Sequence, residues 1–269
     1  MLNVMHTTLT AGLAEPVRLL HITDVHVTRV CEQDSPWQQE QMRKRTVGFW
    51  EEGGKPEYTP EEFLEQALKL AEEVGAVPVI SGDVIDLHTP GNLEWLQQFL
   101  RDHPVLFTPG GHEYQKQFVR VMEEPDNYGR KMLEQFKTEF PEINTIFESH
   151  IIGGVNVILA NNAMDFYPLE AVERFAVELE RDYPIVLFSH DPLDDKRLIV
   201  KTAYHPAVNL TEEEYAVSHR LFDELVCDPK VLSSFTGHDH ESREYIIGGK
   251  THYVTDGLFR GVCRLIEIR

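Results

Sequence analysis

Residues 77–86 constrain the fold most, because a run typical of a buried strand is followed at once by two acids. Valine and isoleucine dominate residues 77–81, and such a short apolar run predicts a buried strand of a parallel sheet. Gly82 ends the strand, and Asp83 and Asp86 come directly after it. Ligands of open α/β sheets bind at the carboxyl ends of strands, so these acids indicate a site. A Gly-Asp pair is also an ordinary turn dipeptide, so Asp83 alone decides nothing.

The same order of strand and polar strand end recurs along the chain. Further strands are predicted over residues 17–23, 104–108, 143–160 with a turn at Gly153-Gly154, 184–188, 230–235, 243–247, 251–255 and 261–268. Helices are predicted from Thr59-Pro60 to Gly75 and over residues 91–101, 126–139, 168–181 and 211–226. This alternation builds parallel sheet through right-handed crossovers.

No linker or change of composition divides the chain, so we expect one domain over residues 1–269. Residues 28–58 are polar and read as irregular. A long insertion so close to a strand end is a candidate lid or substrate wall, and a peripheral decoration without a role is the alternative.

The formal net charge of −20 restricts the partners of the protein. It argues against a protein that holds polymeric nucleic acid through phosphate contacts, which need basic patches. It is compatible with metal-assisted chemistry, in which bound cations supply positive charge, although acidity also serves solubility. The three cysteines are too few and too scattered for a disulfide framework or a thiolate zinc site. Without a signal-peptide pattern in residues 1–16 or an apolar stretch of membrane-spanning length, we expect a cytoplasmic protein with no membrane partner.

Groups that can ligate metals stand at five predicted strand ends. They are Asp24 and His26, Asp83, His112, His190, and His238 and His240. An isolated histidine is more often a surface or hydrogen-bonded residue than a ligand. Two residues separated by one position in an extended segment, however, project to the same side and can clamp one ion. Nitrogen and oxygen donors without sulfur suit Zn, Mn or Fe.

These motifs resemble those of the calcineurin-like metallophosphoesterase family. The matching motifs are Asp24-x-His26, Gly82-Asp83-x-x-Asp86, Gly110-Gly111-His112-Glu113, His190 and Gly237-His238-x-His240, in the family's order. The resemblance implies an α/β fold, a four-layer α/β/β/α sandwich of two mixed β-sheets flanked by helices. It also implies two divalent or trivalent metal ions, expected among Mn, Fe and Zn, at the strand ends.

The resemblance assigns a role to each matching residue. It places Asp24, His26 and His240 on one ion and His190 and His238 on the other, with Asp83 bridging both. His112 is then the catalytic histidine near the leaving group, and Asp86 orients it. The implied reaction is hydrolysis of a phosphate monoester or diester by a metal-bridging hydroxide. The expected partner is a small phosphate ester, with nucleotides among the candidates.

One motif departs from the family, since Gly111 stands where the family has an asparagine that ligates the second ion. The second site is thereby reduced to Asp83, His190 and His238, so we expect this ion to bind more weakly. A water, or the side chain of Asn161 or Asn162, could fill the gap. Two alternatives stay open: a nuclease for short nucleic acids, and a catalytically impaired binding scaffold.

Residues outside the metal motifs receive weaker interpretations. Glu113 is better explained as a turn or supporting carboxylate than as a catalytic group. We expect His88 and His103 at the surface, and His205 is a modest candidate on the substrate side. Six basic residues could contact a phosphate, although solvated faces explain most of them: Arg43, Lys44, Arg45, Lys196, Arg197 and Lys201.

Overall fold

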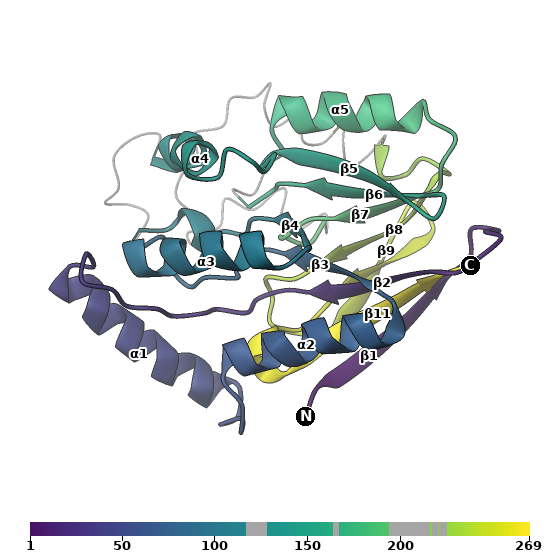
Figure 1. The fold of residues 1–269 in the computed structure, drawn as a ribbon. Helices are drawn as coiled ribbons and strands as arrows, with labels where there is room; N and C mark the ends of the chain where they lie inside the picture. Colours follow the sequence, from purple (N-terminus) through teal and green to yellow (C-terminus); the bar gives the residue numbers. More distant parts are fainter. Residues whose placement is uncertain (117–127, 164–166, 194–215, 217–219, 221–224) are drawn as a thin grey trace.

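Two mixed β-sheets face each other in the computed structural model, which describes residues 1–116, 128–163, 167–193, 216, 220 and 225–269 (Figure 1). The first sheet has the strand order β1 (Asn3–Leu9), β11 (Val262–Ile268), β2 (Val17–Ile22), β3 (Val77–Ser81), β4 (Leu106–Thr108). The second has the order β5 (Phe147–Ile152), β6 (Val155–Ala160), β7 (Ile185–Phe188), β8 (Val231–Thr236), β10 (Lys250–Val254), β9 (Arg243–Ile247). Each sheet combines parallel pairs, such as β2 with β3 and β7 with β8, with antiparallel ones.

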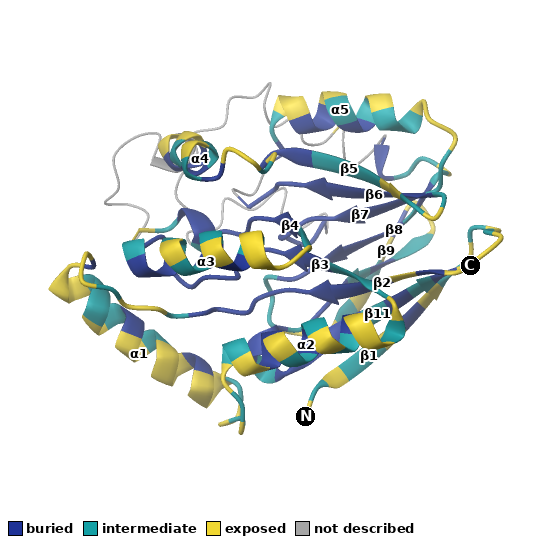
Figure 2. Ribbon diagram, viewed as in Figure 1, coloured by how far each residue is buried: buried dark blue, intermediate teal, exposed yellow. Residues whose placement is uncertain are grey.

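The central strands β2, β6, β7 and β8 are buried on both faces, which explains their largely continuous apolar sequences. In β2, Leu19 packs between the two sheets with residues of β6 and β7, whereas Leu20 and Ile22 pack into the core that includes helix α2. Helices α2 (Pro60–Val74) and α3 (Pro90–Asp102) lie outside the first sheet, and α4 (Tyr128–Glu139) and α5 (Leu169–Leu179) outside the second (Figure 1). Figure 2 shows the central strands largely buried and the edge strand β1 mostly intermediate or exposed, while α2, α3 and α5 are each buried on one side. The predicted four-layer sandwich is confirmed.

The local signals for helix starts and turns act as the sequence predicts. Helix α2 begins with a capping box, in which Thr59 and Glu62 satisfy each other's backbone N–H groups, and Pro60 takes the first helical position. Gly153-Gly154 and Gly248-Gly249 form the hairpin turns, and all four have positive φ.

Two elements differ from the sequence interpretation. Residues 28–58 are not irregular, because they contain helix α1 (Pro36–Glu52), which starts with a capping box between Ser35 and Gln38. Only Met42 and Phe49 of this helix are buried, so the rest of it gives no apolar period to detect. Strand β1 was not predicted either, and it pairs in parallel with β11 at the edge of the first sheet.

The core between the sheets joins both ends of the chain, since Val17 and Ile268 belong to it together with Val157 and Phe235. We therefore propose that residues 1–269 form one domain. The predicted helix over residues 211–226 lies almost entirely outside the described residues. Within the described parts of the chain, helices are either too short or too polar to cross a membrane.

Candidate metal centre

The loops after β2, β3, β7 and β8 meet at one edge of the sandwich. Backbone hydrogen bonds join them, from Asp24 N to Gly82 O (3.1 Å), from His26 N to Asp83 O (2.9 Å) and from Gly237 N to His190 O (2.9 Å). Parallel strands deliver their carboxyl ends to the same edge, and here both sheets contribute. Residues more than 200 positions apart in the chain thereby come into contact, such as His26 and His240.

Unusual backbone conformations mark this edge. Among the described residues, positive φ angles at non-glycine positions occur at Lys55 and at five of the proposed metal ligands: Asp24, His26, Asp83, His238 and His240. Aspartate and histidine tolerate this left-handed region better than most residues, yet each instance costs on the order of 1–3 kcal/mol. Strain concentrated at these five positions indicates that the fold holds their side chains in a required arrangement.

The first cluster consists of Asp24, His26 and His240. The Nε2 atoms of His26 and His240 are 3.0 Å apart, and Asp24 Oδ1 lies 3.4 Å from His240 Nε2 and 3.8 Å from His26 Nε2. Asp24 Oδ2 accepts hydrogen bonds from the Thr23 hydroxyl and from His238 N. Burial alone would raise the pKa of Asp24, but its interactions with His240 and His190 lower that pKa below its usual range.

The second cluster consists of Asp83, His190 and His238. Asp83 Oδ2 lies 3.1 Å from His190 Nε2, which lies 3.3 Å from His238 Nδ1. His190 Nδ1 donates to the carbonyl of Ser81 (2.8 Å), so its Nε2 is left with a lone pair for an ion in the neutral ring. The same Asp83 oxygen is also 3.9 Å from His26 Nε2 and therefore lies between the two clusters.

His112 lies beside both clusters and is held by Asp86. Its Nδ1 donates to the backbone carbonyl of Asp86 (2.6 Å) and lies 3.1 Å from Asp86 Oδ1. Burial would lower the pKa of His112, but the charge of Asp83 and the contact with Asp86 raise it to about 9. Its side chain is 18% exposed, whereas those of Asp24, His26 and His190 are fully buried.

Asp86 supports more than the one histidine that the resemblance assigned to it. Its Oδ1 also lies 3.2 Å from Nδ1 of His26, which leaves the Nε2 of that ring for an ion. Arg45 donates to both carboxylate oxygens, at 2.7 and 2.8 Å. Arg45 therefore neutralises Asp86. Arg43 and Lys44, by contrast, are exposed on the helix beside Glu40, as expected of solvated side chains.

Helix α1 provides three side chains that contact these residues. Besides Arg45, the ring of Phe49 stacks on His26 with centroids 4.1 Å apart, and Glu52 Oε1 lies 2.9 Å from His240 Nδ1. The spacing of positions 45, 49 and 52 places them on one face of the helix. Residues 28–58 therefore contact the candidate site, and a role of this segment as a lid or substrate wall stays a prediction. The sequence interpretation missed helix α1 and these contacts, although Ser35, Pro36 and Gln38 carried the signal for a helix start.

Glu113 is a supporting carboxylate, as expected. It is fully buried and accepts hydrogen bonds from the backbone N–H groups of Asp83, Val84, Ile85 and Gly110 at 2.6–3.1 Å. It thus fastens the loop after β3 to the loop after β4. Burial and the charge of Asp83 raise the pKa of Glu113 to about 7.

Two expectations about other side chains are wrong. His88 is not at the surface but buried, with Nδ1 donating to the Glu113 carbonyl (2.7 Å) and Nε2 3.1 Å from Glu139. Asn161 and Asn162 do not reach a metal position. Asn161 Oδ1 accepts from Ala163 N, and Asn162 Oδ1 accepts from the backbone N–H groups of His190 and Asp191.

His103 is exposed, as expected. His205, Lys196, Arg197 and Lys201 lie outside the described residues.

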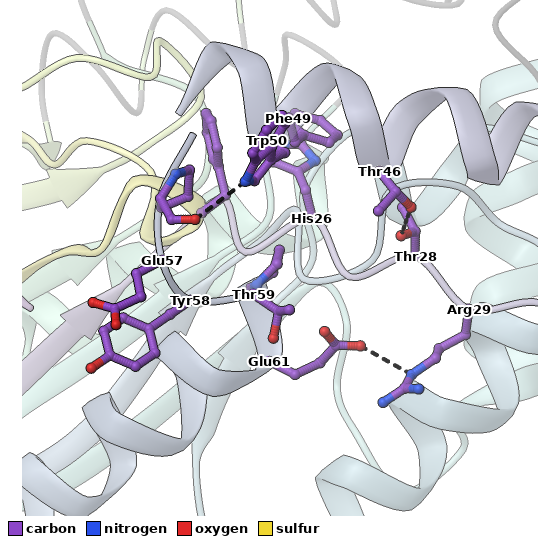
Figure 3. Close-up of a pocket in the computed structure, with 13 residues that line it drawn as sticks. His26, Thr28, Arg29, Thr46, Phe49, Trp50, Glu57, Tyr58, Thr59 and Glu61 are labelled. Carbon is purple, nitrogen blue, oxygen red and sulfur yellow. Dashed lines mark hydrogen bonds and ion pairs between the residues drawn. The ribbon is translucent and has the colours of Figure 1, made fainter. Parts of the chain in front are cut away.

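A cavity of about 390 Å³ adjoins the first cluster on the side of α1 (Figure 3). It lies between the end of α1 and the start of α2, where Phe49, Trp50 and Tyr58 line it. Figure 3 shows Phe49 beside His26, and the ion pair between Arg29 and Glu61 (3.0 Å) at the other end. His26 lines the cavity and His112 does not, so the cavity adjoins the first cluster and not the proposed proton donor.

The donor set fits metal ions. Asp24 Oδ1 is buried and has no hydrogen-bond partner among the described residues. The Nε2 atoms of His26 and His240 face each other, and two unprotonated imidazole nitrogens cannot form a hydrogen bond, whereas both can bind an ion. Three groups of His and Asp side chains are close enough to share an ion, two of which are the clusters described above. Nitrogen and oxygen donors of this kind suit Zn, Mn or Fe.

Comparison with known proteins settles the family. A family model for calcineurin-like phosphoesterases matches residues 17–242. The chain belongs to this family. It is a metallophosphoesterase, a hydrolase that acts on phosphoesters and whose family depends on a dinuclear metal centre. No curated protein sequence matches the chain.

Solved structures share the fold at low sequence identity. A dimetal phosphatase from Danio rerio is 14% identical with a TM-score of 0.50, and the match covers 91% of this chain and 89% of that one. A phosphopantetheinyl hydrolase from Mycobacterium tuberculosis is 13% identical with a TM-score of 0.44, covering 94% and 91% of the two chains. At this identity the first of these likenesses shows the fold of the metallophosphoesterase and nothing finer.

Proposed function

We propose that this metallophosphoesterase hydrolyses a small phosphate monoester or diester, with nucleotides among the candidates. Asp24, His26 and His240 would hold one ion, and Asp83, His190 and His238 the other, with Asp83 shared. Bound ions would supply Lewis acidity toward the phosphate oxygens and an activated water. The meeting of these six side chains from both sheets is the observation that supports the proposal most.

His112 would donate the proton that the departing oxygen needs. Its Nδ1 is committed to the Asp86 carbonyl, so the proton to be transferred is carried on Nε2. That atom lies 3.8 Å from Asp83 Oδ2, beside the carboxylate shared by the two clusters. The side chain also reaches solvent, where a leaving group would depart. Position and access together favour His112 over the buried His26 and His190.

The site favours a small ester over a nucleic acid polymer. The net charge of −20 repels a polyanion, and Arg45, a basic residue at the site, is already paired with the carboxylate of Asp86. A single phosphate group, by contrast, would be attracted by the bound ions themselves.

Metal-reconstituted protein assayed with p-nitrophenyl phosphate, bis-p-nitrophenyl phosphate and a nucleotide panel tests the proposal. We expect turnover with Mn, Zn or Fe and none after chelation. His112→Ala should lose about 10²–10⁴-fold in kcat on alkyl esters, whose leaving groups need a proton. It should lose less on p-nitrophenyl esters and keep its metal content.

His103→Ala is the matched control, because His103 is an exposed histidine outside the site. Absence of metal-dependent turnover of every ester would instead favour a binding scaffold. Equal losses of His112→Ala on alkyl and p-nitrophenyl esters would contradict the proton-donor role.

A further inference from the structure

The short 3₁₀ helix η4 (Leu258–Arg260) lies just before β11, beyond the residues that match the family model, and its backbone contacts the first cluster. Leu258 N donates to the carbonyl of Thr23 (2.9 Å), and Phe259 N donates to that of the proposed ligand Asp24 (3.2 Å). These bonds attach η4 to the loop after β2. Because they use main-chain atoms, they do not depend on the side chains of η4.

The side chain of Phe259 packs against the other two proposed ligands of the first ion. Its ring is buried, and its centroid lies 5.7 Å from that of His26 and 4.8 Å from that of His240. The guanidinium group of Arg260 lies 5.1 Å from the centroid of the same ring. The segment therefore contacts Asp24, His26 and His240 together.

Arg260 forms a closed set of hydrogen bonds with His240 and Glu52. Its Nη1 donates to the backbone carbonyl of His240 and to Asp256 Oδ1 (3.2 Å). Its Nη2 donates to Glu52 Oε1 (2.9 Å), and the same oxygen accepts from His240 Nδ1 (2.9 Å). Both the main chain and the ring of His240 are thus held, and Nε2 of the ring is left for an ion.

Two features of this set explain why His240 needs Arg260. The side chain of Glu52 is 44% exposed, and a contact with such an exposed carboxylate contributes little unless a further bond fixes the carboxylate. The backbone of His240 has a φ of 51°, in the left-handed region that is unfavourable for residues with a side chain. Arg260 fixes the carboxylate and also supplies a donor to the carbonyl of His240.

We propose that Arg260 is a positioning residue for the first ion and acts through His240. Asp24 and His26 follow β2 of the first sheet, whereas His240 follows β8 of the second. Arg260 belongs to η4, which is attached to the loop after β2, so it fixes the ligand of the second sheet against the two ligands of the first. This assignment rests on the proposed dinuclear centre.

Titration of metal-free protein with Mn²⁺ tests the assignment without relying on activity. We expect wild-type protein to bind two ions, and Arg260→Ala to bind one of them about 10–100-fold more weakly, the range for outer partners of ligands. The Arg260 side chain is 28% exposed, so its truncation leaves no large buried cavity. Arg260→Lys should recover part of the loss, because an ammonium group replaces the charge but not the planar fork that binds both acceptors.

Double variants identify which ion is affected. In a His238→Ala protein, which lacks a ligand of the second ion, Arg260→Ala should still weaken the remaining ion. In a His240→Ala protein it should have no further effect on Mn²⁺ affinity, because Arg260 acts through His240. An equal effect of Arg260→Ala in both backgrounds would contradict this route.

Arg18→Ala is the matched control, because Arg18 pairs with Glu267 (3.2 Å) near the start of β2, at the end of the strand away from the site. It should bind both ions as wild type does. A purely structural role would lower the unfolding midpoint of Arg260→Ala and leave both Mn²⁺ affinities unchanged, and that result would overturn the assignment alone. Fewer than two ions in the wild-type protein would overturn the dinuclear centre as well.

Discussion

Asp83 is the residue whose replacement should have the largest effect on the metal centre. Its Oδ2 faces His190 of one cluster and His26 of the other, and its Oδ1 accepts from the backbone N–H of His112 (2.9 Å). We expect Asp83→Ala to lose both ions and to reduce activity below detection, measured by metal content and by kcat on phosphate esters. Asp102→Ala, at the exposed end of α3, should behave as wild type. An Asp83→Ala protein with two tightly bound ions would show that the two clusters do not share a ligand.

Single residues that directly follow a strand can be predicted from the sequence. Residues that reach the site only through a tertiary contact cannot. Asp24, Asp83 and His190 were found because each follows an apolar run. Arg45 and Arg260 carry no such signal, since only the fold brings Arg45 to Asp86 and Arg260 to His240. His88 was assigned wrongly for the same reason, because its partner Glu139 lies 51 positions away in the sequence.

Strands and hairpins were more predictable than helix α1 because different interactions stabilise them. Strands buried on both faces must be apolar throughout, and turns that need positive φ favour glycine, so both leave a local signal. Helix α1 buries few apolar side chains, and several of its described contacts with the site are made by polar side chains. Such contacts depend on partners from distant parts of the chain, which no local pattern reveals. The edge strand β1 was missed as well, because only three of its seven residues are strongly apolar.

Helix α1 should influence the affinity of the first ion through Glu52. His240 Nδ1 donates to Glu52, and this hydrogen bond leaves Nε2 of His240 to bind the ion. We expect Glu52→Ala to weaken the first ion about 10-fold, the low end of the range for outer partners, because Glu52 is 44% exposed. Titration of metal-free protein with Mn²⁺ measures this change. Glu51→Ala removes the same charge from the next, exposed position and should leave the affinity unchanged. Equal affinities of the two variants would exclude a role of α1 through this contact.

On the scale of the whole molecule, the net charge of −20 and the cluster of buried acids both favour stabilisation of the fold by bound cations. Asp24, Asp83, Asp86, Glu113 and Asp191 are each at most 4% exposed and lie around the same edge of the sandwich. In the metal-free protein the histidines replace the missing cations in part, since nearby carboxylates raise the pKa of His240 to about 9 against the effect of burial. Metal ions bound at this edge should therefore stabilise the fold as well as supply its chemistry.

Removal of metal should lower the thermal unfolding midpoint, Tm, and this change should require an intact metal centre. An ion at about 100 times its Kd stabilises the native state by about 2.7 kcal/mol, and each kcal/mol shifts Tm by about 2–4 °C in a chain approaching this size. We thus expect chelation to lower Tm by about 5–10 °C per ion, measured by calorimetry. An acidic surface also binds divalent cations nonspecifically, so the comparison is made at constant ionic strength and includes Asp83→Ala. Because that variant lacks the shared ligand, its Tm should respond little to chelation. If Mn²⁺ raised the Tm of both proteins equally, the stabilisation would come from the acidic surface and not from the metal centre.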